Sequence, residues 1–206
     1  MALPDFLVIG AMKCGTSTLA AQLAAQPGLF VTEPKEPNYF SDDAVFARGQ
    51  GWYEGLFAGA GPDALKGEAS THYTKLPTHP RTLARMAAVL EDPRLVYVIR
   101  DPLARLVSHY IHGWSLGEIR VPLDAALARH PELVAYGRYA MQIEPYLRHY
   151  GPERICLSSL ERLEADPQGE LARIARFVGH AGPVAWAAES ARLNASAERV
   201  RRFPGY

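Results

Sequence analysis

The sequence predicts an α/β fold in which helices flank a doubly wound parallel sheet. Three observations support this class. Short apolar runs alternate with helical patterns along the chain. The run at 95–99 is apolar throughout, as strands buried on both faces are. A glycine-bounded loop also joins the first apolar run, 6–9, to a helical pattern that begins at Thr16.

The individual elements follow from apolar spacing and from residues that start or stop helices. Pro27 and Gly28 end the first helix, whereas Asp101 and Pro102 suit the cap and first turn of a later one. The segment 33–40 contains two prolines and is expected to be a stiff loop at a strand end. We expect strands at 6–9, 29–32, 95–99 and 154–158, the last being the fourth parallel strand, and helices at 16–26, 50–58, 80–90, 102–114, 123–129, 138–150 and 167–178. The polar segment 67–73 is expected to contain a strand end, and 117–121 an exposed loop.

Length and composition describe an ordinary globular chain. Its 206 residues predict a single domain over 1–206. Lys+Arg and Asp+Glu both number 22, so there is no global basic field to attract nucleic acid or an anionic membrane. Two cysteines, Cys14 and Cys156, make no disulfide framework. A strand that begins near Met1, and no apolar run of about 20 residues, predict a cytoplasmic chain without a membrane span. Oligomeric state is not indicated.

The loop after the first strand carries the strongest chemical signal. Glycines let successive N–H groups converge on an anion, and the helix N-terminus adds partial positive charge. Gly10 and Gly15 have the spacing of the nucleotide-triphosphate loop GxxxxGK[ST], so the fold is expected to be of the P-loop type. However, Thr16 stands where that loop has its lysine, and the loop's own lysine is Lys13. The candidate anion-binding residues are Lys13, Cys14, Gly15, Thr16, Ser17 and Thr18.

A second anion site is predicted where the strand 95–99 ends. Arg100 lies at that end, and Arg105 and Ser108 are three residues apart on the following helix, hence on one face. An arginine and a hydroxyl that converge at a strand end can clamp a phosphate. Arg100 and Ser108 are therefore candidate ligands of a second phosphate group, distant from the first.

These motifs resemble sulfotransferases that use 3′-phosphoadenosine 5′-phosphosulfate (PAPS), in particular bacterial relatives of the heparan sulfate N- and O-sulfotransferase group. The resemblance covers most of the chain and includes FLVIGAMKCGTSTL, KEPNYF, GEASTHY, LVYVIRDPLARLVSHY, GRYAMQIEPYL and EADPQGELARIARFVG. One departure is Ala69, where the heparan enzymes have a lysine. This departure weakens any inference of polysaccharide specificity from the resemblance.

The resemblance implies a role for each matched residue. Lys13 and Gly15 to Thr18 would hold the 5′-phosphosulfate, and Arg100 and Ser108 the 3′-phosphate. Glu36 would be the general base when an acceptor hydroxyl, or an amine, of a carbohydrate or other small molecule attacks sulfur in line. Lys13 would stabilise the leaving phosphate. This scheme requires no metal.

Several alternatives stay open at this point. Glu68 or His72 could be the base instead of Glu36, and the arginines of the tail 199–202 could reach the 3′-phosphate. The acceptor pocket is expected in loops 38–66 and 113–137. The chain could instead be a P-loop small-molecule or nucleoside kinase, which needs a lysine at position 16 and magnesium-binding acids. It could also be a non-catalytic nucleotide-binding module.

Overall fold

A five-stranded parallel sheet forms the centre of the computed structural model, which describes residues 3–187. Its strands are β1 (Phe6–Gly10), β2 (Leu29–Val31), β3 (Leu65–Ala69), β4 (Arg94–Ile99) and β5 (Ile155–Ser159). They lie in the order β2-β3-β1-β4-β5, and every pair is parallel. The chain fills one side of β1 with β2 and β3 and then crosses to β4 and β5. Such a reversal of strand order creates a ligand crevice at the carboxyl edge, and the predicted fold class is confirmed.

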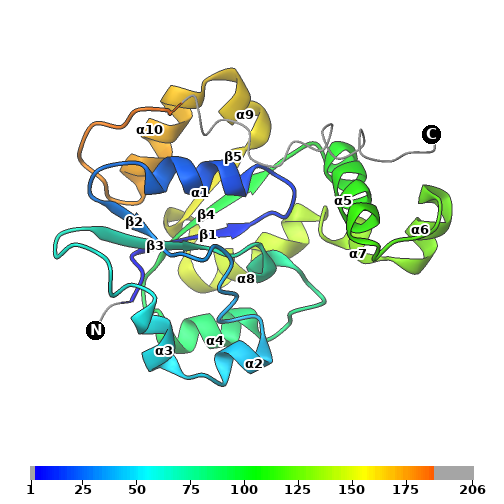
Figure 1. Cartoon of the computed structure of the whole chain (residues 1–206), viewed down its shortest axis with the longest axis horizontal. Helices are drawn as coiled ribbons and strands as arrows, with labels where there is room; N and C mark the ends of the chain where they lie inside the picture. Colours follow the sequence, from blue (N-terminus) through cyan, green and yellow to red (C-terminus); the bar gives the residue numbers. More distant parts are fainter. Residues whose placement is uncertain (1–2, 188–206) are drawn as a thin grey trace.

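Helices cover both faces of this sheet. Figure 1 shows α1, α9 and α10 on one face, α4 and α8 on the other, and α5, α6 and α7 gathered at one end of the molecule. The helices are α1 (Thr16–Ala24), α2 (Asp43–Phe46), α3 (Gln50–Gly55), α4 (Thr82–Val89), α5 (Pro102–Leu116), α6 (Leu123–Arg129), α7 (Glu132–Ala135), α8 (Tyr139–Tyr150), α9 (Leu160–Ala165) and α10 (Pro167–Phe177), with short 3₁₀ turns η1 (Thr71–Thr74) and η2 (Pro152–Arg154). Every helix predicted from the sequence is present. The short helices α2, α7 and α9 were not predicted.

The sheet departs from the prediction in one strand. The polar segment 67–73 was expected to hold only a strand end, and 154–158 to be the fourth strand. Instead β3 is a full strand between β1 and β2, so the sheet has five strands. The strand was not recognised because a buried parallel strand is usually an apolar run, whereas β3 contains Lys66, Gly67 and Glu68. The loop 117–121 also differs from the prediction at Ile119, which is buried.

One apolar core lies between the sheet and its helices. The strands β1 and β4 contribute fully buried side chains, such as Phe6, Ile9 and Val96. A smaller cluster centred on Ile119, Ala126 and Leu133 packs under α5. Within residues 3–187, no helix has the length and apolar character needed to cross a membrane. The predicted single-domain extent over 1–206 stays a prediction, and the arginines of 199–202 lie outside the described residues.

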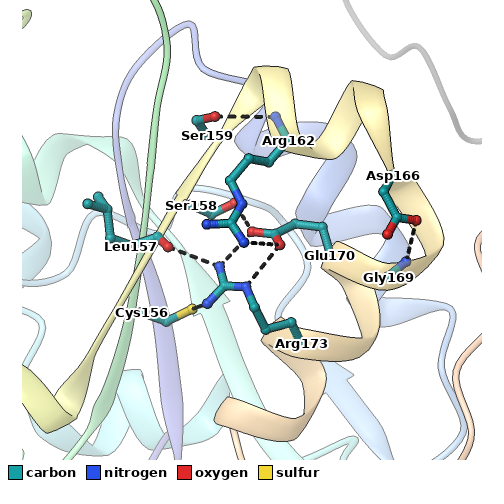
Figure 2. Close-up of polar contacts among 9 residues, drawn as sticks. All are labelled: Cys156, Leu157, Ser158, Ser159, Arg162, Asp166, Gly169, Glu170 and Arg173. Carbon is teal, nitrogen blue, oxygen red and sulfur yellow. Dashed lines mark hydrogen bonds and ion pairs between the residues drawn. The ribbon is translucent and has the colours of Figure 1, made fainter.

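A polar network fastens the edge strand β5 to α9 and α10 (Figure 2). The Glu170 carboxylate is 5% exposed and accepts hydrogen bonds from Ser158 Oγ at 2.6 Å and from Arg173 Nη2 at 2.6 Å. Arg173 also donates to the Leu157 carbonyl and to Cys156 Sγ. A buried carboxylate is tolerated when its oxygens are paired in this way.

Candidate active site

Four loops meet at the carboxyl edge of the sheet. They follow β1, β2, β3 and β4, and backbone hydrogen bonds hold them together. Ala11 N–H donates to the Val98 carbonyl at 2.7 Å, which ties the β1 loop to β4. Ser70 N–H donates to the Val8 carbonyl at 3.0 Å, and Glu36 N–H donates to the Ala69 carbonyl at 3.0 Å. The residues predicted from separate motifs therefore share one edge of the sheet.

The β1 loop closes tightly because Gly10 has no side chain. Gly10 has φ +147°, and a Cβ there would lie 2.0 Å from Thr74 Oγ1. That hydroxyl donates to the Ile9 carbonyl at 2.8 Å and so fixes η1 against the end of β1. Gly15 stands at the N-cap of α1 in the left-handed conformation, and no side chain caps the helix. The first N–H groups of α1 thus keep the donor capacity that an anion can use.

The candidate residues of this loop do not all face outward. Lys13 has φ +69°, and it is half-buried, as are Gly15, Ser17 and Thr18. Thr16 is 4% exposed. The Cys14 thiol is fully buried beside the Tyr139 hydroxyl, and its N–H donates to the Ala11 carbonyl at 3.3 Å. Both donor groups of Cys14 are therefore engaged inside the protein.

The second predicted anion site lies at the carboxyl end of β4, the strand next to β1. Arg100 is half-buried, and its carbonyl accepts a hydrogen bond from the Tyr139 hydroxyl at 2.8 Å. Burial raises the pKa of Cys14 to about 11, and positive charges that include Arg100 partly oppose the shift. Tyr139 thus links the backbone of Arg100 to Cys14 of the loop after β1. Ser108 is 5% exposed on α5.

Arg105, which was expected to share a face with Ser108, is engaged inside the protein, although its Nε has no hydrogen-bond partner among the described residues. Its side chain is fully buried and its guanidinium donates to the Leu133 carbonyl. A second contact joins it to His109 Nδ1 at 3.4 Å. These contacts tie α5 to α7, because a buried guanidinium needs acceptors.

Glu36 lies in the loop after β2 with its carboxylate at the site. Oε1 accepts from Lys35 Nζ at 2.8 Å and from Thr71 Oγ1 at 3.0 Å. Burial alone would raise the pKa of Glu36, but the charge of Lys35 and these two hydrogen bonds outweigh it, and the pKa lies below its ordinary value. Glu36 is therefore ionised at neutral pH and able to accept a proton. Its backbone is left-handed, with φ +60°, as is that of Asn38, with φ +55°.

Glu68, one of the two alternative bases, lies beneath the site rather than in it. It is fully buried and accepts hydrogen bonds from the hydroxyls of Tyr53 at 2.9 Å, Tyr73 at 2.6 Å and Ser70 at 3.3 Å. Burial raises its pKa to about 7 despite these bonds. Ser70 Oγ in turn accepts from Asn38 N–H at 3.1 Å, so Glu68 supports the loop that carries Glu36.

His72, the other alternative, stacks on a second imidazole. The rings of His72 and His79 are 4.7 Å apart with an angle of 16° between their planes. Burial, and then the positive charge of Lys75, lower the pKa of His72 to about 4. The His72 imidazole is therefore uncharged at neutral pH. Among the described residues, no group of three or more His, Cys, Asp and Glu side chains is placed to hold a metal ion.

The sequence reasoning missed Lys75, which follows η1 at the same edge. Lys75 is only 8% exposed. Neither a glycine motif nor a helical pattern marks this position. A usable signal was its place after the strand β3, once that strand is recognised, because polar residues at such ends line the sites of α/β folds.

Comparison with known proteins decides the family. Residues 3–198 match the family model described as a sulfotransferase domain. The chain belongs to the sulfotransferase family. The suspected resemblance is therefore confirmed, and the kinase interpretation is wrong. The structure agrees, because the position where a kinase loop has its lysine holds Thr16, which is buried.

Relatives and solved structures agree with this assignment. The chain is 31% identical over 189 residues to mouse heparan sulfate glucosamine 3-O-sulfotransferase 3B1, covering 86% of this chain and 46% of that protein. It thus spans about half the length of the curated relatives it matches. A sulfotransferase structure from Alicyclobacillus acidocaldarius superimposes with a TM-score of 0.79 at 26% identity, covering 91% of this chain and 86% of that one. Mouse sulfotransferase SULT7A1, solved with PAP (3′-phosphoadenosine 5′-phosphate), shares the fold, with a TM-score of 0.56 at 15% identity and coverage of 96% and 63%.

Proposed function

We propose that this sulfotransferase moves a sulfuryl group from PAPS to an acceptor hydroxyl, or an amine, of a carbohydrate or other small molecule. One observation carries the proposal. The anion-binding loop after β1, the Arg100 end of β4 and the ionised Glu36 share the carboxyl edge of one sheet. A donor with separate 5′ and 3′ phosphate groups needs two anion sites, and a transfer to a hydroxyl needs a base beside them.

The donor's charges match the two sites. The uncapped N-terminus of α1, the hydroxyls of Ser17 and Thr18, and Lys13 would hold the 5′-phosphosulfate. Arg100 and Ser108 would hold the 3′-phosphate. This second site separates the donor from ATP and ADP, which lack a 3′-phosphate.

The loop after β1 then acts on the leaving phosphate, and the loop after β2 acts on the acceptor. The acceptor oxygen attacks sulfur, and a new S–O bond forms as the S–O bond to the 5′-phosphate breaks. The electron pair of that bond stays on the departing phosphate oxygen, where Lys13 and the loop N–H groups stabilise the charge. The acceptor's proton goes to the Glu36 carboxylate. Glu36 suits this role because it is ionised and held by Thr71, whereas Glu68 is sealed in the core.

Names of the relatives support a carbohydrate acceptor. Several are heparan sulfate glucosamine 3-O-sulfotransferases, at 29–31% identity. However, Ala69 stands where the resembled enzymes have a lysine. The acceptor would therefore be bound by other groups of this chain, supplied by the segments 38–66 and 113–137.

The direct test is transfer of a labelled sulfuryl group. Purified protein is incubated with ³⁵S-PAPS and either heparan sulfate or p-nitrophenol, and labelled product and PAP are quantified. We expect equal amounts of product and PAP from the wild type with at least one acceptor. Glu36→Gln should lower the rate by about 10²–10⁴-fold, the usual contribution of a general base.

The matched control is Glu33→Gln, an exposed carboxylate of the same loop. It should keep the wild-type rate. Equal rates for Glu36→Gln and Glu33→Gln would remove Glu36 from the mechanism. Tight binding of PAP without transfer to either acceptor would favour the non-catalytic nucleotide-binding module.

A further inference from the structure

Lys75, a residue that is 8% exposed, brings an ammonium group to the same edge as Glu36. It follows directly on η1, whose first residue, Thr71, donates a hydrogen bond to Glu36 Oε1 at 3.0 Å. Its own carbonyl accepts a hydrogen bond from His79 N–H at 3.1 Å, and the next residue, Leu76, is held at both its N–H and its carbonyl by Gln142. The backbone that positions Lys75 is thus fixed on both sides.

Among the described residues, no carboxylate oxygen lies within ion-pair distance of the Lys75 ammonium, although the charge of Glu36 partly opposes the shift of its pKa. Glu36 forms its ion pair with Lys35 at 2.8 Å. The contact recorded for Lys75 is the ring of Tyr136, whose centroid is 5.7 Å from Nζ. Burial lowers the pKa of Lys75 to about 8, so the group still carries its charge at neutral pH. Burying a cation that has no ion-pair partner costs free energy. Functional sites often contain such a cation, because a bound anionic ligand then supplies the partner.

The Tyr136 ring next to the Lys75 ammonium also contacts α5. The ring stacks on the His109 imidazole, with centroids 5.7 Å apart and an angle of 15°. Burial lowers the pKa of His109 to about 3, and the positive charges of Arg105, Lys75 and Lys13 add to the shift.

We propose that the Lys75 ammonium is a catalytic residue that binds the oxygens of the sulfuryl group during its transfer. The inference rests on the proposed function and assigns a further residue to that site. In the proposed function, both phosphates of the donor are bound by the segments that follow β1 and β4. Lys75 and Glu36 follow β3 and β2, on the other half of the edge. The sulfuryl group is the part of the donor that must reach this half, because there it meets the acceptor.

Binding of the donor with and without its sulfuryl group tests this role without knowledge of the acceptor. Calorimetry is run with PAPS and with PAP on the wild type, Lys75→Met, Lys75→Arg and Lys66→Met. Lys75→Met should weaken PAPS binding by about 10-fold, as expected for one charge-assisted contact, and leave PAP binding within twofold. Lys75→Arg should keep part of the preference for PAPS. Lys66→Met, at the other end of β3, should match the wild type for both.

The outcomes separate the two claims. Unchanged PAP binding shows that Lys75→Met has folded and kept its phosphate sites. PAPS binding by Lys75→Met that equals the wild type, or an equal loss for PAPS and PAP, would overturn the role of Lys75. Failure of the wild type to bind either ligand would instead overturn the proposed function.

Discussion

At the scale of single residues, the site depends on positions where a side chain would not fit. Gly10 allows Thr74 to close on the end of β1, and Gly15 opens the N-terminus of α1 by its left-handed conformation. A Cβ on Gly15 would also lie 2.8 Å from Leu160 Cδ1. The glycine spacing that was visible in the sequence therefore marks two positions where the fold leaves no room for a side chain.

Substitution of Gly10 by alanine tests the closure of the loop. The added Cβ would lie 2.0 Å from Thr74 Oγ1, on a backbone with φ +147°. We expect Gly10→Ala to lower the free energy of unfolding by about 2–4 kcal/mol through overpacking and backbone strain, and to weaken PAP binding. Urea unfolding measures the first effect and calorimetry the second.

The control for this substitution is Gly51→Ala in α3, where a Cβ would meet nothing within 4 Å. It should leave PAP binding unchanged and should not lower stability, because alanine is a better helix former than glycine. Equal stability of Gly10→Ala and the wild type would refute the steric account of the loop.

Glu68 makes stability depend on pH in a direction opposite to that of an ion-paired carboxylate. Its pKa in the folded protein, about 7, exceeds the ordinary value of 4.5. The folded state therefore binds more protons between these values. Stability from this group is present below pH 4.5 and is lost as pH rises through 7. As pH rises across this range, the free energy of unfolding of the wild type should thus fall by roughly 1–3 kcal/mol relative to that of Glu68→Gln.

Urea unfolding at intervals from pH 4.5 to 8 checks this prediction. The quantity to compare is the difference in unfolding free energy between wild type and variant, since other titrating groups cancel. Glu91→Gln, an exposed carboxylate, should give a flat difference. A flat difference for Glu68→Gln as well would contradict the raised pKa.

Sequence reasoning at this scale found the residues that belong to short motifs. Lys13, Glu36 and Arg100 lie in loops at the carboxyl edge, Glu36 having been found through the resemblance, and Ser108 lies on α5, the helix that follows Arg100. Lys75 and the supporting role of Glu68 were missed, because no local pattern distinguishes a buried charge from an exposed one. Both depend on β3, whose neighbours in space are distant in sequence.

At the scale of elements, apolar strands and well-capped helices were predictable and short or polar elements were not. The start of α5 was correct because Asp101 Oδ1 does accept from Ala104 N–H, at 2.7 Å. The full extent of β3 was missed because Lys66, Gly67 and Glu68 interrupt the apolar run that marks a buried parallel strand. The helix α9 was missed although its cap, Ser159, is visible in the sequence.

The edge of the sheet offers a test of how polar contacts fasten an element. Glu170→Ala should lower the free energy of unfolding by about 2 kcal/mol, because the buried carboxylate holds Ser158 of β5 and Arg173 of α10 together. Hydrogen bonds from Arg173 hold the pKa of Glu170 below its ordinary value despite burial. The stabilisation should therefore be present at neutral pH and be lost as pH falls through that lowered pKa.

Urea unfolding at pH 7 and at pH 3 measures both effects, with Glu164→Ala, an exposed carboxylate of α9, as control. The control should stay close to the wild type. If Glu170→Ala were as stable as the wild type at pH 7, the network in Figure 2 would contribute nothing to the attachment of β5.

At the scale of the whole molecule, the order of the strands explains why separate motifs form one site. The chain builds β1, then β2 and β3 on one side, then β4 and β5 on the other. The donor's phosphates would therefore lie over β1 and β4, and the base and Lys75 over β2 and β3. Parallel pairing makes this convergence predictable once the strands are known. The acceptor is less predictable, because loops rather than the sheet build its pocket.

The central claim is that this edge holds a nucleotide with two separate phosphate groups, and calorimetric titration with PAP tests it most directly. ADP serves as the ligand that lacks the 3′-phosphate. Arg100→Ala removes the second site, and Arg94→Ala, at the opposite end of β4, is the matched control. We expect micromolar binding of PAP to the wild type and to Arg94→Ala, much weaker binding of ADP, and loss of PAP binding in Arg100→Ala. Equal affinity for PAP and ADP in the wild type, or no binding of either, would contradict the account.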